Sequence, residues 1–180
     1  MMGRCLQALR RFGKDESGSV IMLEFVIMVP LVFSTFLMSV ELGIYSVRHM
    51  FLDRGMDIAV RYVRLNSDDE NITHQFLKDM ICDNAGFLED CGNTLKLEMA
   101  KVDPRNFGAL DPEPRCIDLS QPPEPDQGLN LGEEHELMLL RACVKFRPVF
   151  PTTGLGKALE KDGTGRVRMT SIAAYVLEPS

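Results

Sequence analysis

One uninterrupted apolar segment constrains this chain more than any other feature. It covers Phe25–Val40 (FVIMVPLVFSTFLMSV) without a charged residue, and Glu24 and Glu41 flank it. With its apolar shoulders, Val20–Ile44, the segment makes a helix of about 37 Å, which exceeds the roughly 30 Å hydrocarbon core of a bilayer. Because a helix satisfies its own backbone amides in lipid, the segment predicts one membrane-spanning helix.

Two other interpretations of the segment are weaker. A core helix of a soluble protein would need a large domain around it, and the remaining chain is too polar to supply one. A cleaved signal peptide has an apolar core of about 7 to 15 residues and ends in a small-x-small site, which is missing here. The helical periodicity also continues beyond the segment. The apolar positions of this continuation are Val47, Phe51, Ile58 and Tyr62, with Gly55 on the same stripe. We therefore predict one transmembrane and stalk helix over residues 19–65.

The polar and helix-breaking residues of the segment lead to separate expectations. A carboxylate at membrane depth costs a few kcal/mol and usually has a partner, which makes Glu24 a functional candidate. The alternative is that its side chain extends back to the headgroups near the start of the helix. Glu41 is expected to mark the opposite interface and to have no further role. Pro30 lacks a backbone donor, so we expect a kink or local unwinding there.

The segment divides the chain into a basic leader over residues 1–18, the helix over residues 19–65 and a domain over residues 66–180. The leader has four basic and two acidic residues, a net charge of +2. Since the whole chain carries −6, the rest of the chain carries −8. The basic leader favours a cytoplasmic N-terminus, although four arginines follow the apolar segment and match it in number. An acidic domain does not suit a phosphate backbone, so we expect no nucleic-acid partner.

The domain alternates between helical and strand patterns. Residues 72–85 have the apolar spacing of an amphipathic helix. Three strands are predicted within residues 94–102, 136–150 and 165–177. In the first of them Leu95, Leu97 and Met99 alternate with charged residues, which predicts a half-buried strand. Residues 103–132 are rich in proline, aspartate and glycine and predict a surface excursion, and residues 151–160 predict a turn that includes one helical turn. The domain is therefore expected to be α+β, with a helix packed on a small, mainly antiparallel sheet.

Four of the five cysteines follow the apolar segment, namely Cys82, Cys91, Cys116 and Cys143, whereas Cys5 precedes it. An even set beyond the segment suits an oxidising compartment and two disulfides, which favours an external domain. Of the three possible pairings we favour Cys82–Cys91 and Cys116–Cys143, because the first pair is close in sequence and joins a helix end to the following loop. Four reduced core thiols are the alternative. Zinc is disfavoured because no CxxC spacing occurs.

The sequence contains no evident catalytic constellation. His49, His74 and His135 lie in three different predicted elements, without the spacing of metal ligands. The GTGR of residues 163–166 lacks the spacing of a phosphate-binding loop. We therefore predict a non-enzyme with no cofactor and no metal site.

The N-terminal third resembles a known family. A basic head ending in RRFGKDESGSV, followed by LEF and an apolar run with an early proline, is similar to the TadE-like proteins. These are the minor pseudopilin family of Flp/Tad pilus assembly systems. The continuation VELGIYSVRHMFLDRGMDIAVRYVRL, the late PTTGLG and the last strand also resemble this family. The likeness therefore covers most of the chain and is most specific over Arg10–Leu65. It implies a single-pass protein of the bacterial inner membrane, with a cytoplasmic N-terminus and a periplasmic domain.

The resemblance also implies a processing site. A prepilin peptidase would cut after the glycine matched by Gly18, so that Ser19 becomes the first residue. Glu24 and Phe25 match the motif glutamate and its aromatic neighbour, and the glutamate would pair with the new amino terminus of a neighbouring subunit. The family motif has four residues between glycine and glutamate, whereas this chain has five (SVIML). The cut therefore follows Gly18, follows Ser19 or does not occur.

The implied function is that of a membrane-anchored minor pseudopilin-like component required for assembly of Flp/Tad pili, acting by helix packing and periplasmic docking. The implied partners are the prepilin peptidase, other pilins or pseudopilins, and the Tad inner-membrane platform. Two alternatives stay open from the sequence. One is an unprocessed assembly scaffold of the same system, which the extra residue before Glu24 favours. The other is a periplasmic binding module that uses the helix as a tether.

Overall fold

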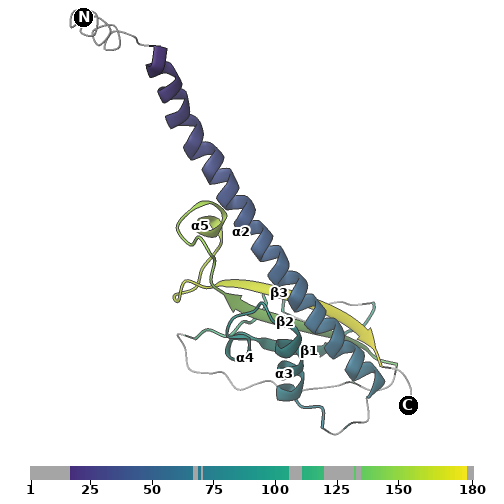
Figure 1. Ribbon diagram of the computed structural model, residues 1–180. Helices are drawn as coiled ribbons and strands as arrows, with labels where there is room; N and C mark the ends of the chain where they lie inside the picture. The colour runs from purple at the N-terminus through teal and green to yellow at the C-terminus, as the bar shows by residue number, and fades with distance from the viewer. Residues whose placement is uncertain are drawn as a thin grey trace, which may run out of the picture.

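The computed structural model describes residues 17–66, 69, 71–105, 111–119, 132 and 135–177. Its longest element is α2 (Ser17–Leu65), a single helix of 49 residues. The first half of α2 stands clear of the rest of the chain, and the second half packs on the domain (Figure 1). This confirms the predicted long N-terminal helix, and the leader lies outside the described residues up to residue 16. The helix continues through Pro30, so the local unwinding expected there does not occur.

The domain is α+β, as predicted. In the described ranges it contains α3 (His74–Asn84), α4 (Cys91–Thr94), β1 (Lys96–Lys101), β2 (Leu137–Phe146), α5 (Gly154–Ala158) and β3 (Val167–Val176). The strands form one antiparallel sheet in the order β1-β2-β3. The helix expected over residues 72–85 corresponds to α3, which begins after the N-cap Thr73, whose hydroxyl accepts a hydrogen bond from the Phe76 amide. The short α4 was not predicted.

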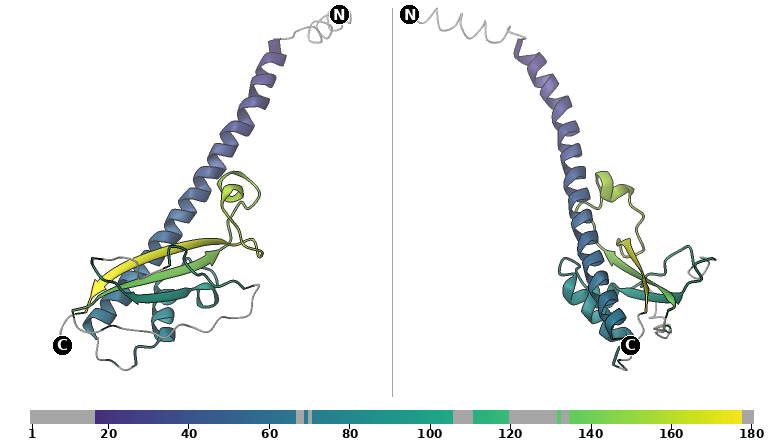
Figure 2. Two further views of the ribbon diagram at one scale, coloured as in Figure 1. Left: turned by 180° about the vertical axis from the view of Figure 1, so that it is seen from behind. Right: turned by 90° about the vertical axis from the view of Figure 1, so that its right-hand side faces the viewer.

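One face of the sheet is covered by helices. The second half of α2 and α3 lie against it, with β3 and β2 beneath α2 (Figure 2). The buried apolar side chains of α2 are Leu52, Met56, Ala59 and Val63. Gly55 of the predicted stripe is buried as well, whereas its other members from residue 51 onward are only partly buried and lie one residue, or about 100°, away from the buried side chains. At Gly55, α2 and α3 approach so closely that an added Cβ would lie 2.7 Å from the Ile81 carbonyl oxygen.

The other face of the sheet is covered over β1 and β2, which makes the prediction of a half-buried first strand wrong. Along β3 that face stays open, and Ile172, which pairs with Arg141, is 59% exposed. Glu98 of β1 and Arg141 of β2 are both buried, and the Arg141 Nε donates to Glu98 at 2.6 Å. The second guanidinium arm donates to the Asp111 carbonyl oxygen at 2.6 Å. Residues 111–119 of the predicted excursion thus cover Glu98 and Arg141. Their charges are stabilised by the ion pair between them instead of by contact with solvent. The excursion's residues 106–110 and 120–131 lie outside the described residues, as do residues 133–134 after it.

Two disulfides connect these layers. Cys82–Cys91 joins the end of α3 to the start of α4, with 5.6 Å between Cα atoms. Cys116–Cys143 attaches the covering segment to β2, with 5.2 Å between Cα atoms. These are the pairings favoured from the sequence, and they use all four cysteines that follow the apolar segment. Reduced thiols and a zinc site are therefore not the arrangement in this structure.

Candidate functional site

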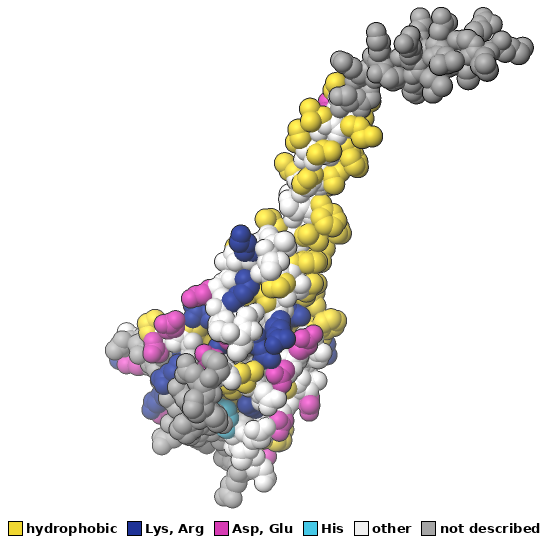
Figure 3. All heavy atoms as spheres, turned by 90° about the vertical axis from the view of Figure 1, so that its left-hand side faces the viewer, with side chains coloured by type: hydrophobic (Ala, Val, Ile, Leu, Met, Phe, Trp, Pro, Cys, Tyr) yellow, Lys and Arg dark blue, Asp and Glu magenta, His cyan; other side chains and the backbone are white. Residues whose placement is uncertain are grey.

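The first half of α2 exposes apolar side chains on all sides. Every residue from Val20 to Phe36 is exposed, including Phe25, whose exposed fraction is 66%. This helix is long and apolar enough to cross a membrane, and its most apolar part is not buried against the protein. Figure 3 shows this band of hydrophobic side chains leading away from the domain. The interpretation as a buried core helix is wrong, because the most apolar part of α2 is exposed and the domain packs mainly on the other half of the helix.

The residues of the proposed processing motif lie on this free half. Gly18 and Ser19 are in the first turn of α2, and Glu24 and Phe25 are exposed further along it. Since α2 is continuous from Ser17, the extra residue before Glu24 is absorbed into the helix and is not looped out. Gly18 and Glu24 are therefore about 9 Å apart along the helix axis. The fold therefore does not restore the spacing of four residues between glycine and glutamate that the family motif has.

Glu24 is the one ionisable side chain in this exposed apolar surface between Val20 and Val40. In the part of the chain that the structure describes, no side chain forms an ion pair with it. A carboxylate within lipid is costly without a partner. If this half of α2 spans a membrane, Glu24 either has a positive partner from another molecule or extends back to the headgroups near the start of the helix. The disulfide cysteines lie in the domain, so the fold does not bring them near Glu24.

Glu41 lies where α2 enters the domain, and sequence reasoning assigned it no role. Its exposed fraction is 2%. One carboxylate oxygen accepts a hydrogen bond from the Val149 amide at 3.1 Å, and the other accepts from the Phe150 amide at 2.8 Å. These charge-assisted bonds offset the cost of burying the carboxylate. The expectation that Glu41 only marks an interface is wrong, because the loop after β2 folds over this turn of α2.

Arg48 holds the same loop two helical turns further on. Its guanidinium donates to the Arg147 carbonyl oxygen at 2.9 Å and lies 5.0 Å from the centre of the Phe146 ring. We call Glu41, Arg48 and residues 146–150 the junction. Its sequence signal is the heptad spacing of the buried stripe, which extends back from Leu52 through Arg48 to Glu41. The predicted stripe lies one residue away and leads back from Val47 to Val40, so the sequence pattern alone does not single out Glu41.

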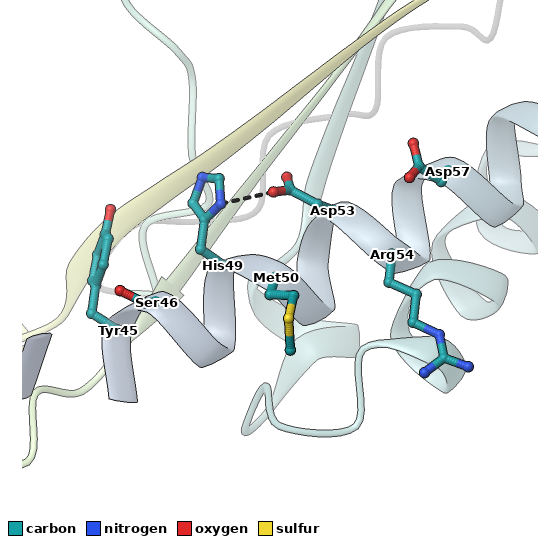
Figure 4. Close-up of a pocket in the computed structure, with 7 residues that line it drawn as sticks. All are labelled: Tyr45, Ser46, His49, Met50, Asp53, Arg54 and Asp57. Atoms are coloured by element: carbon teal, nitrogen blue, oxygen red, sulfur yellow. Dashed lines mark ion pairs between the residues drawn. The ribbon is translucent and has the colours of Figure 1, made fainter. Parts of the chain in front are cut away.

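Alongside the junction and beyond it, α2 carries an open groove (Figure 4). Its lining residues are Tyr45, Ser46, His49, Met50, Asp53, Arg54 and Asp57. The His49 Nδ1 lies 2.9 Å from one Asp53 oxygen, and the Ser171 hydroxyl donates to the other at 2.5 Å. The His49 Nε2 faces the Thr170 carbonyl oxygen at 3.2 Å.

This serine, histidine and aspartate cluster does not form a nucleophilic site. The hydroxyl donates to the carboxylate and not to the imidazole, and the outer imidazole nitrogen faces a backbone carbonyl instead of a serine. The contacts therefore attach α2 to β3. That the protein is not an enzyme stays a prediction.

A second charged cluster stabilises the end of the sheet. Asp162 accepts hydrogen bonds from the amides of Thr164 and Arg166, at 2.9 and 3.0 Å, and its other oxygen lies 2.8 Å from the Lys145 Nζ. Burial opposes the charged form of Asp162, but the hydrogen bonds from Lys145, Arg166 and Thr164 outweigh it and hold the pKa of this carboxyl well below its ordinary value. This cluster contributes to stability. Over the described residues, no group of three or more His, Cys, Asp or Glu side chains could hold a metal ion.

The structure thus defines a class of protein in which a small disulfide-bonded α+β domain is built around the second half of a membrane-length helix. Comparisons of the chain with protein-family models, curated proteins and solved structures find no match.

Proposed function

We propose that the chain is a membrane-anchored minor pseudopilin-like component required for assembly of Flp/Tad pili. The observation that carries this proposal is the form of α2, whose first half is an exposed apolar helix and whose second half is part of the domain core. The resemblance of Arg10–Leu65 to TadE-like proteins supports the pilus system in particular. In this proposal the apolar half lies in the bacterial inner membrane, the N-terminus is cytoplasmic and the domain is periplasmic. The two disulfides support an oxidising compartment for the domain.

The proposed work is helix packing and docking. The exposed half of α2 would contact other pilins or pseudopilins, or the Tad inner-membrane platform. Glu24 would pair with a neighbour's positive amino terminus, and the low dielectric of the membrane strengthens such a pair. Because only one axial position brings the two charges together, the pair would select the register between subunits.

The first experiment identifies the N-terminus of the mature protein. Mass spectrometry on isolated membranes, with and without the prepilin peptidase, should find a start at Ser19 or Val20 that is lost without the peptidase. The first turn of α2 must unwind for this cut, and Gly18 favours the extended backbone that a protease site requires. An unprocessed start in both strains would contradict cleavage and favour the scaffold of the same system. That second candidate is supported by the continuous helix between Gly18 and Glu24, which keeps the motif out of register.

The second experiment tests the role of the carboxylate. Glu24→Gln should reduce pilus formation while the amount of protein in the membrane stays the same. Met28→Leu, a change of similar size on the same exposed apolar helix, is the matched control and should leave pilus formation unchanged. Normal pili in the Glu24→Gln strain would remove the proposed charge pair.

A further inference from the structure

A loop at one end of the domain lies beside the apolar half of α2. We call residues 147–161, which include α5, the foot. The foot projects from the end of the sheet toward the free end of α2 (Figures 1 and 2). It contacts the apolar segment itself, because a Cβ added at Gly154 would lie 2.8 Å from the Met38 Cγ. The foot is therefore the part of the domain that reaches the last turns of the apolar segment.

The position of this contact along α2 sets its depth. The helix from Val20 to Val40 is about 31 Å long, which matches a hydrocarbon core of about 30 Å. If this segment spans the bilayer, Met38 and Glu41 lie at its boundary. The foot contacts Met38, and its backbone amides donate hydrogen bonds to Glu41. It would then lie at the level of the lipid headgroups.

The side chains of the foot suit that environment. It contains Arg147, Lys157 and Lys161 against one acidic residue, Glu160, so its net charge is +2 in a chain whose total charge is −6. Arg147 and Lys157 are exposed, as is Val149 at 44%. Basic side chains next to an exposed apolar one are typical of a membrane-surface contact. Figure 3 shows basic side chains on the end of the domain nearest the apolar band.

We propose that the foot binds the headgroups of anionic phospholipids next to the point where α2 leaves the bilayer. This inference rests on the proposed membrane span and not on the pilus system. The junction supplies the rigidity, because Glu41 fixes two backbone amides of the foot and Arg48 fixes a carbonyl. The domain would therefore be oriented by two attachments, the helix and the foot.

The test uses the full-length chain in vesicles of phosphatidylcholine alone and of equal parts phosphatidylcholine and phosphatidylglycerol. A nitroxide attached at Thr152→Cys, with Cys5 replaced by serine, reports its depth through relative accessibility to oxygen and to a water-soluble nickel chelate. We expect immersion at headgroup level in the anionic vesicles and less immersion in phosphatidylcholine. A label at Asp57→Cys lies about 24 Å beyond Glu41 along α2 and should stay aqueous in both.

Charge reversal tests the ligand. The double variant Arg147→Glu, Lys157→Glu should return the Thr152 label to water in anionic vesicles, since each basic side chain near an anionic surface contributes about fivefold to binding. Both changes keep the backbone carbonyls that bond with Arg48 and Lys161. Arg61→Glu, an exposed charge reversal on the part of α2 remote from the foot, is the matched control and should change nothing.

The outcomes separate the two levels of the proposal. A chain that fails to float with vesicles after alkaline washing overturns the membrane span and the foot contact together. A chain that floats but keeps the Thr152 label aqueous in anionic vesicles overturns the foot contact and leaves the proposed function intact. Equal immersion in the two lipid compositions, or no response to charge reversal, overturns anionic headgroups as the ligand.

Discussion

Glu41→Gln tests whether a buried carboxylate holds the domain to the helix. The substitution keeps the size of the side chain but leaves one acceptor oxygen and places an amide NH₂ where the second oxygen was. In the structure both oxygens accept backbone hydrogen bonds, at 3.1 Å from Val149 and 2.8 Å from Phe150. The variant loses one of these bonds and turns a donor toward a buried donor.

The cost follows from these contacts. A hydrogen bond to a charged group contributes about 1.5–3 kcal/mol, and a buried donor without an acceptor costs about 1–3 kcal/mol. We expect the junction of the variant to open about 3 kcal/mol more easily, which is roughly a hundredfold in the opening equilibrium. The loss is local, because the core between α2, α3 and the sheet does not include Glu41.

Hydrogen exchange of the full-length chain in lipid nanodiscs measures this opening. The amides of Val149 and Phe150 should exchange roughly a hundredfold faster in Glu41→Gln, while the α3 amides keep their protection. Glu24→Gln is the control, because it makes the same chemical change on the same helix at an exposed position. Unchanged exchange at the two amides in Glu41→Gln, or equal acceleration in the Glu24→Gln control, would refute the reasoning.

Three further perturbations address the domain. Replacing Cys116 and Cys143 by alanine should lower the free energy of unfolding by about 1 kcal/mol more than replacing Cys82 and Cys91. The longer loop, with a sequence separation of 27, predicts a stabilisation of about 3.6 kcal/mol, and the shorter one, with a separation of 9, predicts about 2.6 kcal/mol. Urea unfolding followed by near-ultraviolet circular dichroism checks this difference. The pKa of Asp162 is lowered, so its stabilisation is present above about pH 4 and is lost as the pH falls below that value. Asp162→Asn should remove this part of the pH dependence from acid unfolding curves. Gly55→Ala should destabilise by about 1–3 kcal/mol through its clash with an α3 carbonyl, whereas Gly43→Ala, with no atom within 4 Å, should be neutral or stabilising by up to about 1 kcal/mol in thermal unfolding.

The elements with strong periodicity could be predicted from the sequence. The apolar segment and the helical spacing after it predict α2, and alternation predicts the three strands, because these patterns record which face is buried. The exact buried stripe of α2 could not be fixed in this way. Phe51 and Leu52 are both apolar, and the pattern alone does not say that Leu52 is completely buried while Phe51 stays partly exposed.

The segment that covers the second face of β1 and β2 could not be predicted, for a different reason. Residues 111–119 contain no helix or strand, so they carry no periodic signal that they cover the sheet. Glu98 and Arg141 are charged and would be assigned to solvent by pattern alone, whereas the structure buries them as a pair. The Cys116–Cys143 pairing was the only sequence clue to this layer, and it does not state which face is covered. Glu41 was missed similarly, because its partners are backbone amides of a loop more than one hundred residues away.

Residues inserted into α2 would distinguish the proposed assembly component from a tethered binding module, because α2 is one continuous helix. A tether works without a fixed angle between its anchor and its domain, whereas a packing helix must present the same face to its partner. One alanine inserted between Phe36 and Leu37 rotates the apolar segment by about 100° relative to the domain and leaves the junction unchanged. Four alanines rotate it by about 40° net, because four residues make slightly more than one turn.

If the proposed function is right, the single insertion should abolish pilus formation and the fourfold insertion should partly restore it, while both variants reach the membrane in normal amounts. Electron microscopy and counting of pili measure this in the host. A tethered module would tolerate both insertions equally. Progressive loss with the number of inserted residues would instead indicate that the length of the segment matters and its face does not, which would contradict the selection of register by Glu24.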